Sequence, residues 1–219
     1  MSPPPMVSYR KGMFADEPLA EDSFSAHYFE FEATCHHEAA HAVSEYVFGN
    51  SLEFVGVKTE YLTQPDGSID VMVGGEVRRI HRSARVCVNY DYRPMLFVVG
   101  VVAAAGPAGE RRYRYERGAP MRLLGASEGD HLAIDTIGKS LERRGRSRFA
   151  FRRHVWWHAQ KLIAHDIVWR AISDIAKELS DTGITRGSEP DVHWRQLLPQ
   201  DVYRICRRHG LKQGIARVA

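Results

Sequence analysis

The chain has 219 residues and a formal net charge of +3, with 44% hydrophobic and 26% charged residues, which suits one large domain with its own core. The longest apolar run, residues 95–109, is broken by glycine and proline and is too short to span a bilayer, and the first residues lack a secretory pattern. Three widely spaced cysteines, Cys35, Cys87 and Cys206, exclude a disulfide framework and a Cys-x-x-Cys zinc site. We therefore expect a protein of the reducing cytoplasm without a membrane span.

The first part of the chain predicts a flexible tail, a long helix and a hairpin. Residues 1–24 are rich in proline and acids and show no period, so we assign them to an N-terminal tail and residues 25–219 to one domain. A helix is expected over 25–48, ended by Gly49. Two strands, 52–60 and 68–77, flank the turn 64–67. The edge of this hairpin could accept an extended peptide as a further strand.

The remaining chain predicts mainly helices. The second helix starts between 84 and 92 and ends near 115, with a kink or close packing at Gly106-Pro107. Its expected core stripe is Met95, Val98, Val99, Val102 and Ala103. A third helix is expected to end near 144, with Ile134, Ile137 and Leu141 facing inward. A fourth helix is expected over 147–179, with the pair Trp156-Trp157 in the core. A polar loop over 181–192 and a short helix over 199–208 complete the chain. The fold class is mainly α with a small β-hairpin or sheet.

The long first helix carries His37-Glu38-x-x-His41. At 3.6 residues per turn, His37 and His41 lie on the same face about 6 Å apart, so two imidazole nitrogens can converge on one metal. Glu38 lies about 100° away, where its carboxylate can reach a water on that metal but is poorly placed as a ligand. Zinc hydrolases use this arrangement for their general base. The sequence therefore predicts a catalytic zinc site.

Catalytic zinc needs a third protein ligand, and the sequence leaves several carboxylates open for this role. No histidine follows His41 at close spacing, because the next one is His81. A carboxylate is therefore expected from a later helix. The candidates are Glu110, Glu128, Asp130 and Asp135.

Residues 33–49, ATCHHEAAHAVSEYVFG, resemble the zinc helix of the FtsH-type ATP-dependent metallopeptidase family, whose motif is His-Glu-Ala-Gly-His. Residues 98–112 are similar to that family's apolar helix ending Gly-Gly-Arg-Ala-Ala-Glu-Glu, and residues 125–130 to its Gly-Ala-x-Asn-Asp. The resemblance implies a zincin-like helical peptidase domain with Asp130 as the third zinc ligand. Ala40 replaces a family glycine, and one residue is inserted before Asp130. The family's membrane segments and ATPase module have no counterpart here.

The expected function is a zinc-dependent endopeptidase with His37, His41 and Asp130 as metal ligands and Glu38 as general base. Its substrate would be a peptide or an unfolded protein. As a single chain it should be independent of ATP because no phosphate-binding loop is present, and a separate ATPase is a candidate partner. The alternative is a non-catalytic or regulatory zinc-fold module that binds nucleic acid or a protein through the basic stretch 139–153, with seven basic residues and one acidic. We interpret that stretch as a solvated surface and do not expect nucleic acid binding.

Overall fold

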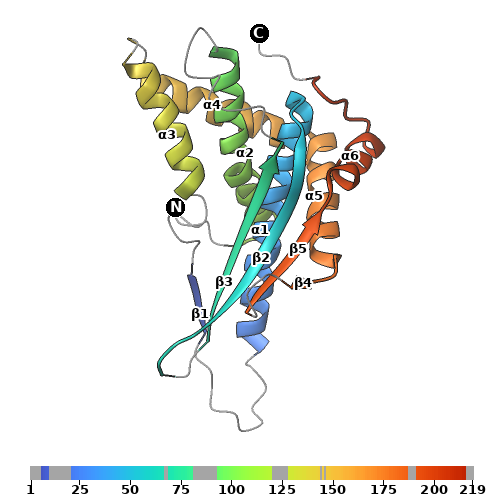
Figure 1. Ribbon diagram of the computed structural model, residues 1–219. Coiled ribbons are helices and arrows are strands. Elements are labelled where there is room, and N and C mark those ends of the chain that lie inside the picture. Colours follow the sequence, from blue (N-terminus) through green and yellow to red (C-terminus); the bar gives the residue numbers. More distant parts are fainter. Residues whose placement is uncertain are drawn as a thin grey trace.

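The structure is a computed structural model that describes residues 6–9, 21–66, 69–80, 93–119, 128–143, 145, 147–186 and 191–215. These parts form a mainly helical protein with one small antiparallel sheet (Figure 1), as the sequence predicts. The helices are α1 (Glu21–Phe48), α2 (Arg93–Glu116), α3 (Glu128–Glu142), α4 (Arg148–Ala164), α5 (Asp166–Asp181) and α6 (Pro199–Arg208). The strands are β1 (Met6–Tyr9), β2 (Leu52–Thr63), β3 (Ile69–Arg79), β4 (Thr185–Arg186) and β5 (Val192–Leu197). No helix in these described ranges has the length and apolar character needed to cross a membrane.

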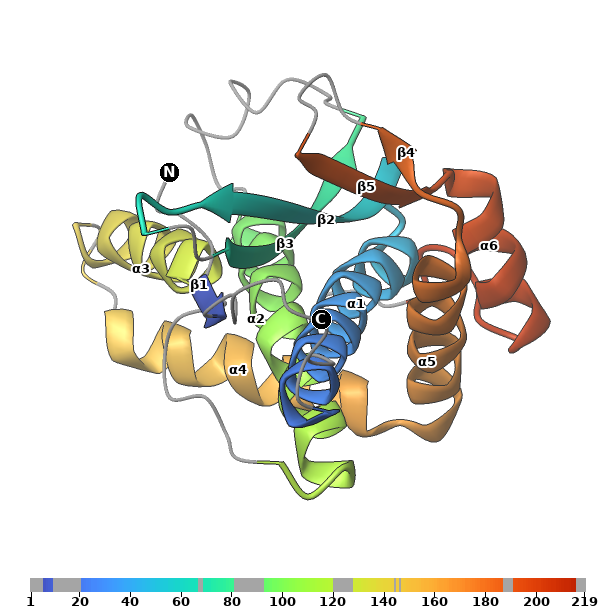
Figure 2. The same cartoon turned by 90° about the horizontal axis from the view of Figure 1, so that it is seen from below.

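Helix α1 lies in the middle of the fold, with α2 on one side, α5 on the other and the sheet along a third side (Figure 2). Its small residues Ala39, Ala40, Ala42 and Val43 are fully buried, which allows neighbouring elements to approach closely. The predicted end is confirmed, because Gly49 adopts a φ of 83° that favours glycine and its N–H is bonded to Tyr46. The helix begins at Glu21, four residues before the expected start.

The sheet has the strand order β1-β3-β2-β5-β4. The predicted hairpin is present as β2 and β3, which pair Val57 with Gly75. Three strands form where the sequence predicts none. Strand β1 lies within the expected tail and pairs with the start of β3. Strand β4 lies in the expected polar loop over 181–192, and β5, which begins at the last residue of that loop, pairs antiparallel with β2 and with β4. Only Leu197 of β5 is fully buried, so its apolar pattern is weak and the strand depends on non-local pairing.

The predicted core stripe of α2 is partly wrong. Val102 and Ala103 are buried, but Val98 and Val99 are only half-buried and Met95 is 44% exposed. In the described part of α2, continuous burial begins only at Gly100, after the first turns of the helix. Helix α2 continues through Pro107 and ends at Glu116, close to the predicted end near 115.

A single fourth helix over 147–179 is also wrong, because His165 has an extended backbone (φ −73°, ψ 123°) that separates α4 from α5. The two helices pack against different partners, α4 against α2 and α5 against α1. The break lets both apolar faces reach the core. The prediction that both tryptophans lie in the core is only partly right, because Trp156 is partly buried and packs against the core, whereas Trp157 is 46% exposed. The inward residues predicted for α3, Ile134, Ile137 and Leu141, are confirmed as buried.

Candidate metal centre

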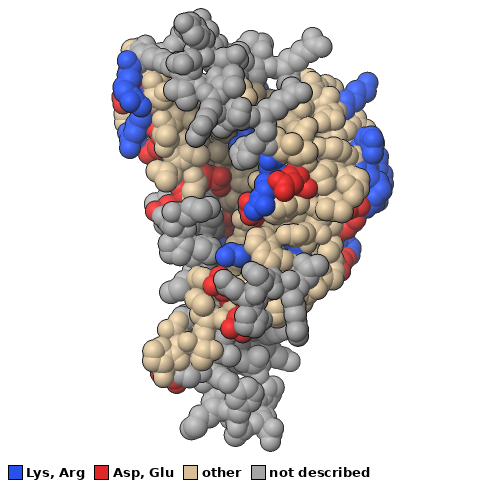
Figure 3. Space-filling model, viewed as in Figure 1, with Lys and Arg blue, Asp and Glu red and all other residues tan. Residues whose placement is uncertain are grey.

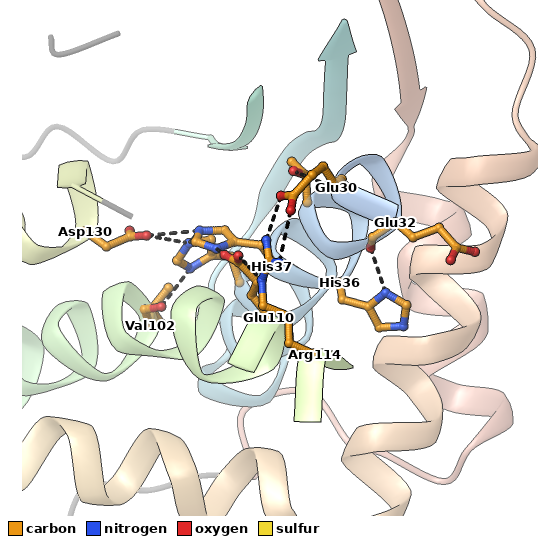
Figure 4. Close-up of polar contacts among 10 residues, drawn as sticks. Glu30, Glu32, His36, His37, Val102, Glu110, Arg114 and Asp130 are labelled. Carbon is orange, nitrogen blue, oxygen red and sulfur yellow. Dashed lines mark hydrogen bonds and ion pairs between the residues drawn. The ribbon is translucent and has the colours of Figure 1, made fainter. Parts of the chain in front are cut away.

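Two helices bring His37, His41 and Asp130 together. The histidines occupy one face of α1, and Asp130 comes from the first turn of α3, 93 residues after His37 (Figure 4). Asp130 Oδ2 lies 3.0 Å from His37 Nε2 and 3.4 Å from His41 Nε2, and the two Nε2 atoms are 3.1 Å apart. The three groups each offer one ligand atom, and these atoms all lie within 4.8 Å of one another. The sequence-predicted ligand residues therefore meet at one point.

The other ring nitrogen of each histidine is bound to an acceptor. His41 Nδ1 lies 2.8 Å from the carbonyl oxygen of Val102, and His37 Nδ1 lies 3.2 Å from Glu110 Oε2. A carbonyl and a carboxylate only accept hydrogen bonds, so each neutral imidazole carries its proton on Nδ1. Both Nε2 atoms then direct lone pairs toward Asp130. This orientation by outer groups is the usual support of metal-binding histidines.

The arrangement of these three acceptors fits a metal ion. With both histidines neutral, two nitrogen lone pairs and a carboxylate oxygen face one another and repel, and this repulsion is relieved either by a second proton on a histidine or by a metal cation among the three groups. Zinc binds nitrogen and oxygen at about 2.0–2.2 Å, which places tetrahedral ligand atoms about 3.3–3.6 Å apart. The observed separations of 3.0, 3.1 and 3.4 Å are close to that spacing. The donor set of two imidazoles and one carboxylate also suits zinc.

The electrostatics of the site also favour positive charge among the three ligands. Burial opposes protonation of His37, but hydrogen bonds to Asp130 and Glu110 outweigh it and hold the pKa of His37 well above its usual value. The pKa of His41 is raised for a similar reason, since the charge of Asp130 outweighs its burial. Burial would raise the pKa of Asp130, yet the charge of His41 and the bonds from both histidines lower it. Asp130 is therefore ionised at neutral pH, as a ligand must be.

Glu38 lies beside the three ligands but outside them, as its place on the helix predicts. Its side chain is 5% exposed and packs against Gly75 of β3 so closely that a Cβ on Gly75 would lie 2.3 Å from Glu38 Cγ. Burial raises the pKa of Glu38, and the charges of His37 and His41 oppose that rise. A buried carboxylate with a raised pKa next to a metal position can take up and return a proton.

Glu110, the main competitor for the third ligand position, has a different place. It contacts His37 at Nδ1, on the ring nitrogen that does not face the cluster, and it accepts a bond from Arg114 Nε at 2.8 Å. Arg114 in turn donates to Glu30 at 2.7 and 3.1 Å (Figure 4). This buried chain of charges orients His37. Sequence reasoning missed Arg114 and Glu30, although the i,i+4 spacing of Glu110 and Arg114 was a readable signal.

The other candidate carboxylates do not reach the site. Asp135 pairs with Arg148 at 2.6 Å and with Arg152 at 3.9 Å, and Glu128 is exposed. The positive charges of Arg148 and Arg152, two of the basic residues in the stretch 139–153, are thus partly neutralised by Asp135 of α3.

Two residues near the site have no role in it. His36 bonds the Glu32 carbonyl through Nδ1 and stacks on Tyr113, so it lies away from the ligand face (Figure 4). Cys35 is 1% exposed and burial raises the pKa of its thiol, so packing is its role, as expected. Cys87 lies outside the described residues.

A glycine of α2 lies against the candidate metal ligands. A Cβ on Gly106 would lie 2.2 Å from His41 Nε2 and 2.6 Å from His37 Nε2, so only glycine leaves space there. Of the kink or close packing that the sequence predicts at Gly106-Pro107, the close packing is present at Gly106.

Comparison of the chain with protein-family models and with curated proteins found no match to either. The resemblance to the FtsH-type peptidases therefore rests on the quoted residues and remains a prediction.

Proposed function

We propose that this protein is a zinc-dependent endopeptidase that acts on flexible or unfolded segments of protein without ATP. The observation that carries the proposal is the meeting of His37, His41 and Asp130 within 4.8 Å, with the buried carboxylate of Glu38 beside them. A purely structural zinc site closes its coordination with four protein ligands and needs no base. Three ligands and an adjacent carboxylate support a hydrolytic site instead.

The side chains divide the work between holding the ion and moving a proton. His37, His41 and Asp130 would hold zinc, which when bound polarises a water and the scissile carbonyl. Glu38 would take a proton from the attacking water and deliver it to the leaving amine. Burial of Glu38 supports this role, because a raised pKa makes the carboxylate a better base and its protonated form accessible.

The sheet supports a peptide substrate. Gly75, which contacts Glu38, lies in β3, and β1 covers only residues Ile69–Met72 on the outer edge of β3. Within the described strands, the backbone of 73–79 on that edge has no strand partner. An extended peptide can pair with such an edge through its main chain, independently of its side chains. This would place a backbone amide next to Glu38.

The test combines metal content with proteolysis. The purified protein should bind about one zinc per chain and cleave an unfolded protein such as reduced casein. A chelator should stop cleavage, added zinc should restore it, and ATP should have no effect. Zinc-loaded Glu38→Gln should lose at least about 100-fold in turnover, because general-base catalysis contributes on that order. Glu128→Gln, which changes an exposed carboxylate near Asp130, is the matched control and should retain activity.

Two results would oppose the proposal. Zinc-loaded Glu38→Gln that cleaves at the normal rate would remove the general-base role. Stoichiometric zinc binding without cleavage of any unfolded substrate would favour the regulatory module.

A further inference from the structure

Helix α4 has an outward face that combines large aromatic side chains with cations. Phe149 is 80% exposed and Trp157 is 46% exposed, and Arg153 and Lys161 are also exposed. These four residues follow one another at intervals of four, so they form a single row along the helix, which we call the α4 stripe. Helix α4 lies on the side of α2 away from the sheet (Figure 2), and its residues take no part in the metal centre.

The α4 stripe keeps its positive charge. The 17 residues of α4 include three arginines and one lysine but no aspartate or glutamate. Arg148 and Arg152 are paired with Asp135, whereas no carboxylate of the described residues lies within ion-pair distance of Arg153. Lys161 Nζ lies 4.0 Å from the centroid of the Trp157 ring, and no carboxylate of the described residues lies within ion-pair distance of it. Figure 3 shows further Lys and Arg side chains at the edge of the molecule over α3.

A hollow of about 740 Å³ opens beside the α4 stripe, between α2, α3 and α4. None of the described residues that line it carries a carboxylate, and most of its walls are apolar. The lining residues are Phe97, Leu141, Ser147, Ala150, Phe151, Arg153, His154 and Trp157. Such a hollow suits an apolar group that is attached to an anion.

We propose that the α4 stripe docks the protein on an anionic lipid surface. Basic residues near anionic headgroups each add to membrane attraction, and tryptophan and phenylalanine favour the boundary between headgroups and acyl chains. The α4 stripe presents both kinds of side chain from one helix, and the hollow offers apolar walls to an acyl chain. A nucleic acid would match the charge but not these walls, and Lys161 already covers part of the Trp157 ring on which a base would stack.

The test uses the full chain and vesicles, and it does not depend on catalysis. Co-sedimentation should show binding to vesicles of phosphatidylcholine with about 30% phosphatidylserine, weaker binding at high salt, and little binding to pure phosphatidylcholine. Arg153→Glu/Lys161→Glu should weaken binding at least about tenfold. Arg207→Glu/Lys212→Glu, which makes the same change of charge on the exposed C-terminal side, should bind as the wild type does. Phe149→Ala/Trp157→Ala should also weaken binding to the vesicles. Tyr115→Ala is the matched control and should not weaken it, because Tyr115 is an aromatic residue that is 77% exposed but lies outside the α4 stripe.

Three outcomes would overturn the proposal. The first is no binding of the wild type to anionic vesicles. The second is equal weakening by the α4 and C-terminal charge variants, which would mean that net charge alone is responsible. The third is that the wild type binds a single-stranded oligonucleotide or an acidic peptide, and that the α4 variants lose this binding while they bind vesicles normally. This result would assign the α4 stripe to that partner.

Discussion

Glu110 Oε2 lies 3.2 Å from Nδ1 of His37, and both side chains are buried. Asp130 approaches the same ring at Nε2, so the two carboxylates contact different nitrogens of one imidazole. Only one of these nitrogens faces His41. The geometry therefore supports Asp130 as the metal ligand and Glu110 as the group that orients the ring.

This division of roles predicts different losses of zinc affinity. Glu110→Gln should weaken zinc binding about 10- to 100-fold, as expected when an outer partner of a ligand is changed. Asp130→Ala should weaken it more and abolish cleavage, because it removes a ligand. Competition with a chromophoric chelator measures both affinities. Should Glu110→Gln lose zinc while the Asp130 variant keeps it, the glutamate would be the third ligand.

Gly106→Ala should block the metal position without unfolding the protein. The added Cβ would lie 2.2 Å from His41 Nε2, and His41 cannot move aside easily because Val102 holds its Nδ1. Alanine favours a helix, so far-UV circular dichroism should be unchanged while zinc affinity falls at least about tenfold. Gly183→Ala, where no atom lies within 4 Å of the added Cβ, is the control. Normal zinc binding by Gly106→Ala would show that the ion lies elsewhere.

Gly75→Ala should have the opposite pattern, with zinc retained and catalysis lost. Its Cβ would lie 2.3 Å from Cγ and 2.5 Å from Oε1 of Glu38, so the carboxylate has to shift. A displacement of about 1 Å in a catalytic group can cost on the order of 100-fold in rate. Turnover measured on the zinc-loaded variant should show a loss of that size, with metal content as in the wild type. Unchanged turnover would mean that the position of Glu38 does not matter for the reaction.

Asp174 should contribute stability that depends on pH. Burial would raise the pKa of Asp174, but hydrogen bonds from His209 Nε2 at 2.8 Å and Arg208 Nη2 at 2.7 Å lower it. A carboxyl whose pKa is lower in the folded state stabilises the protein above its unfolded pKa of about 3.9, and this contribution is lost as the pH falls through the folded pKa. Asp174→Asn should therefore reduce the free energy of unfolding at pH 7, by less than about 1 kcal/mol because the group is partly exposed. Urea unfolding at pH 7, 5 and 3.5 should show the difference shrinking only at the lowest pH, and a constant difference would contradict this assignment.

The sequence was sufficient for features that depend on local spacing. The helix that carries His37, Glu38 and His41 follows from 3.6-residue geometry, and its end follows from the backbone freedom of Gly49. The hairpin follows from alternation around a turn. The break at His165 did not follow, because no proline or glycine marks it and it arises from packing α4 and α5 against different helices.

By itself, then, the sequence determined two histidines on one helical face, the adjacent carboxylate and a mainly helical fold, because residues three and four apart are placed by the helix alone. It left Glu110 and Asp130 as alternatives, since both are carboxylates on later helices. Only the tertiary structure decided which of them meets the Nε2 atoms. That choice depends on how α2 and α3 pack against α1, and such packing is determined by the buried surfaces of the whole core and not by the spacing of residues along one helix.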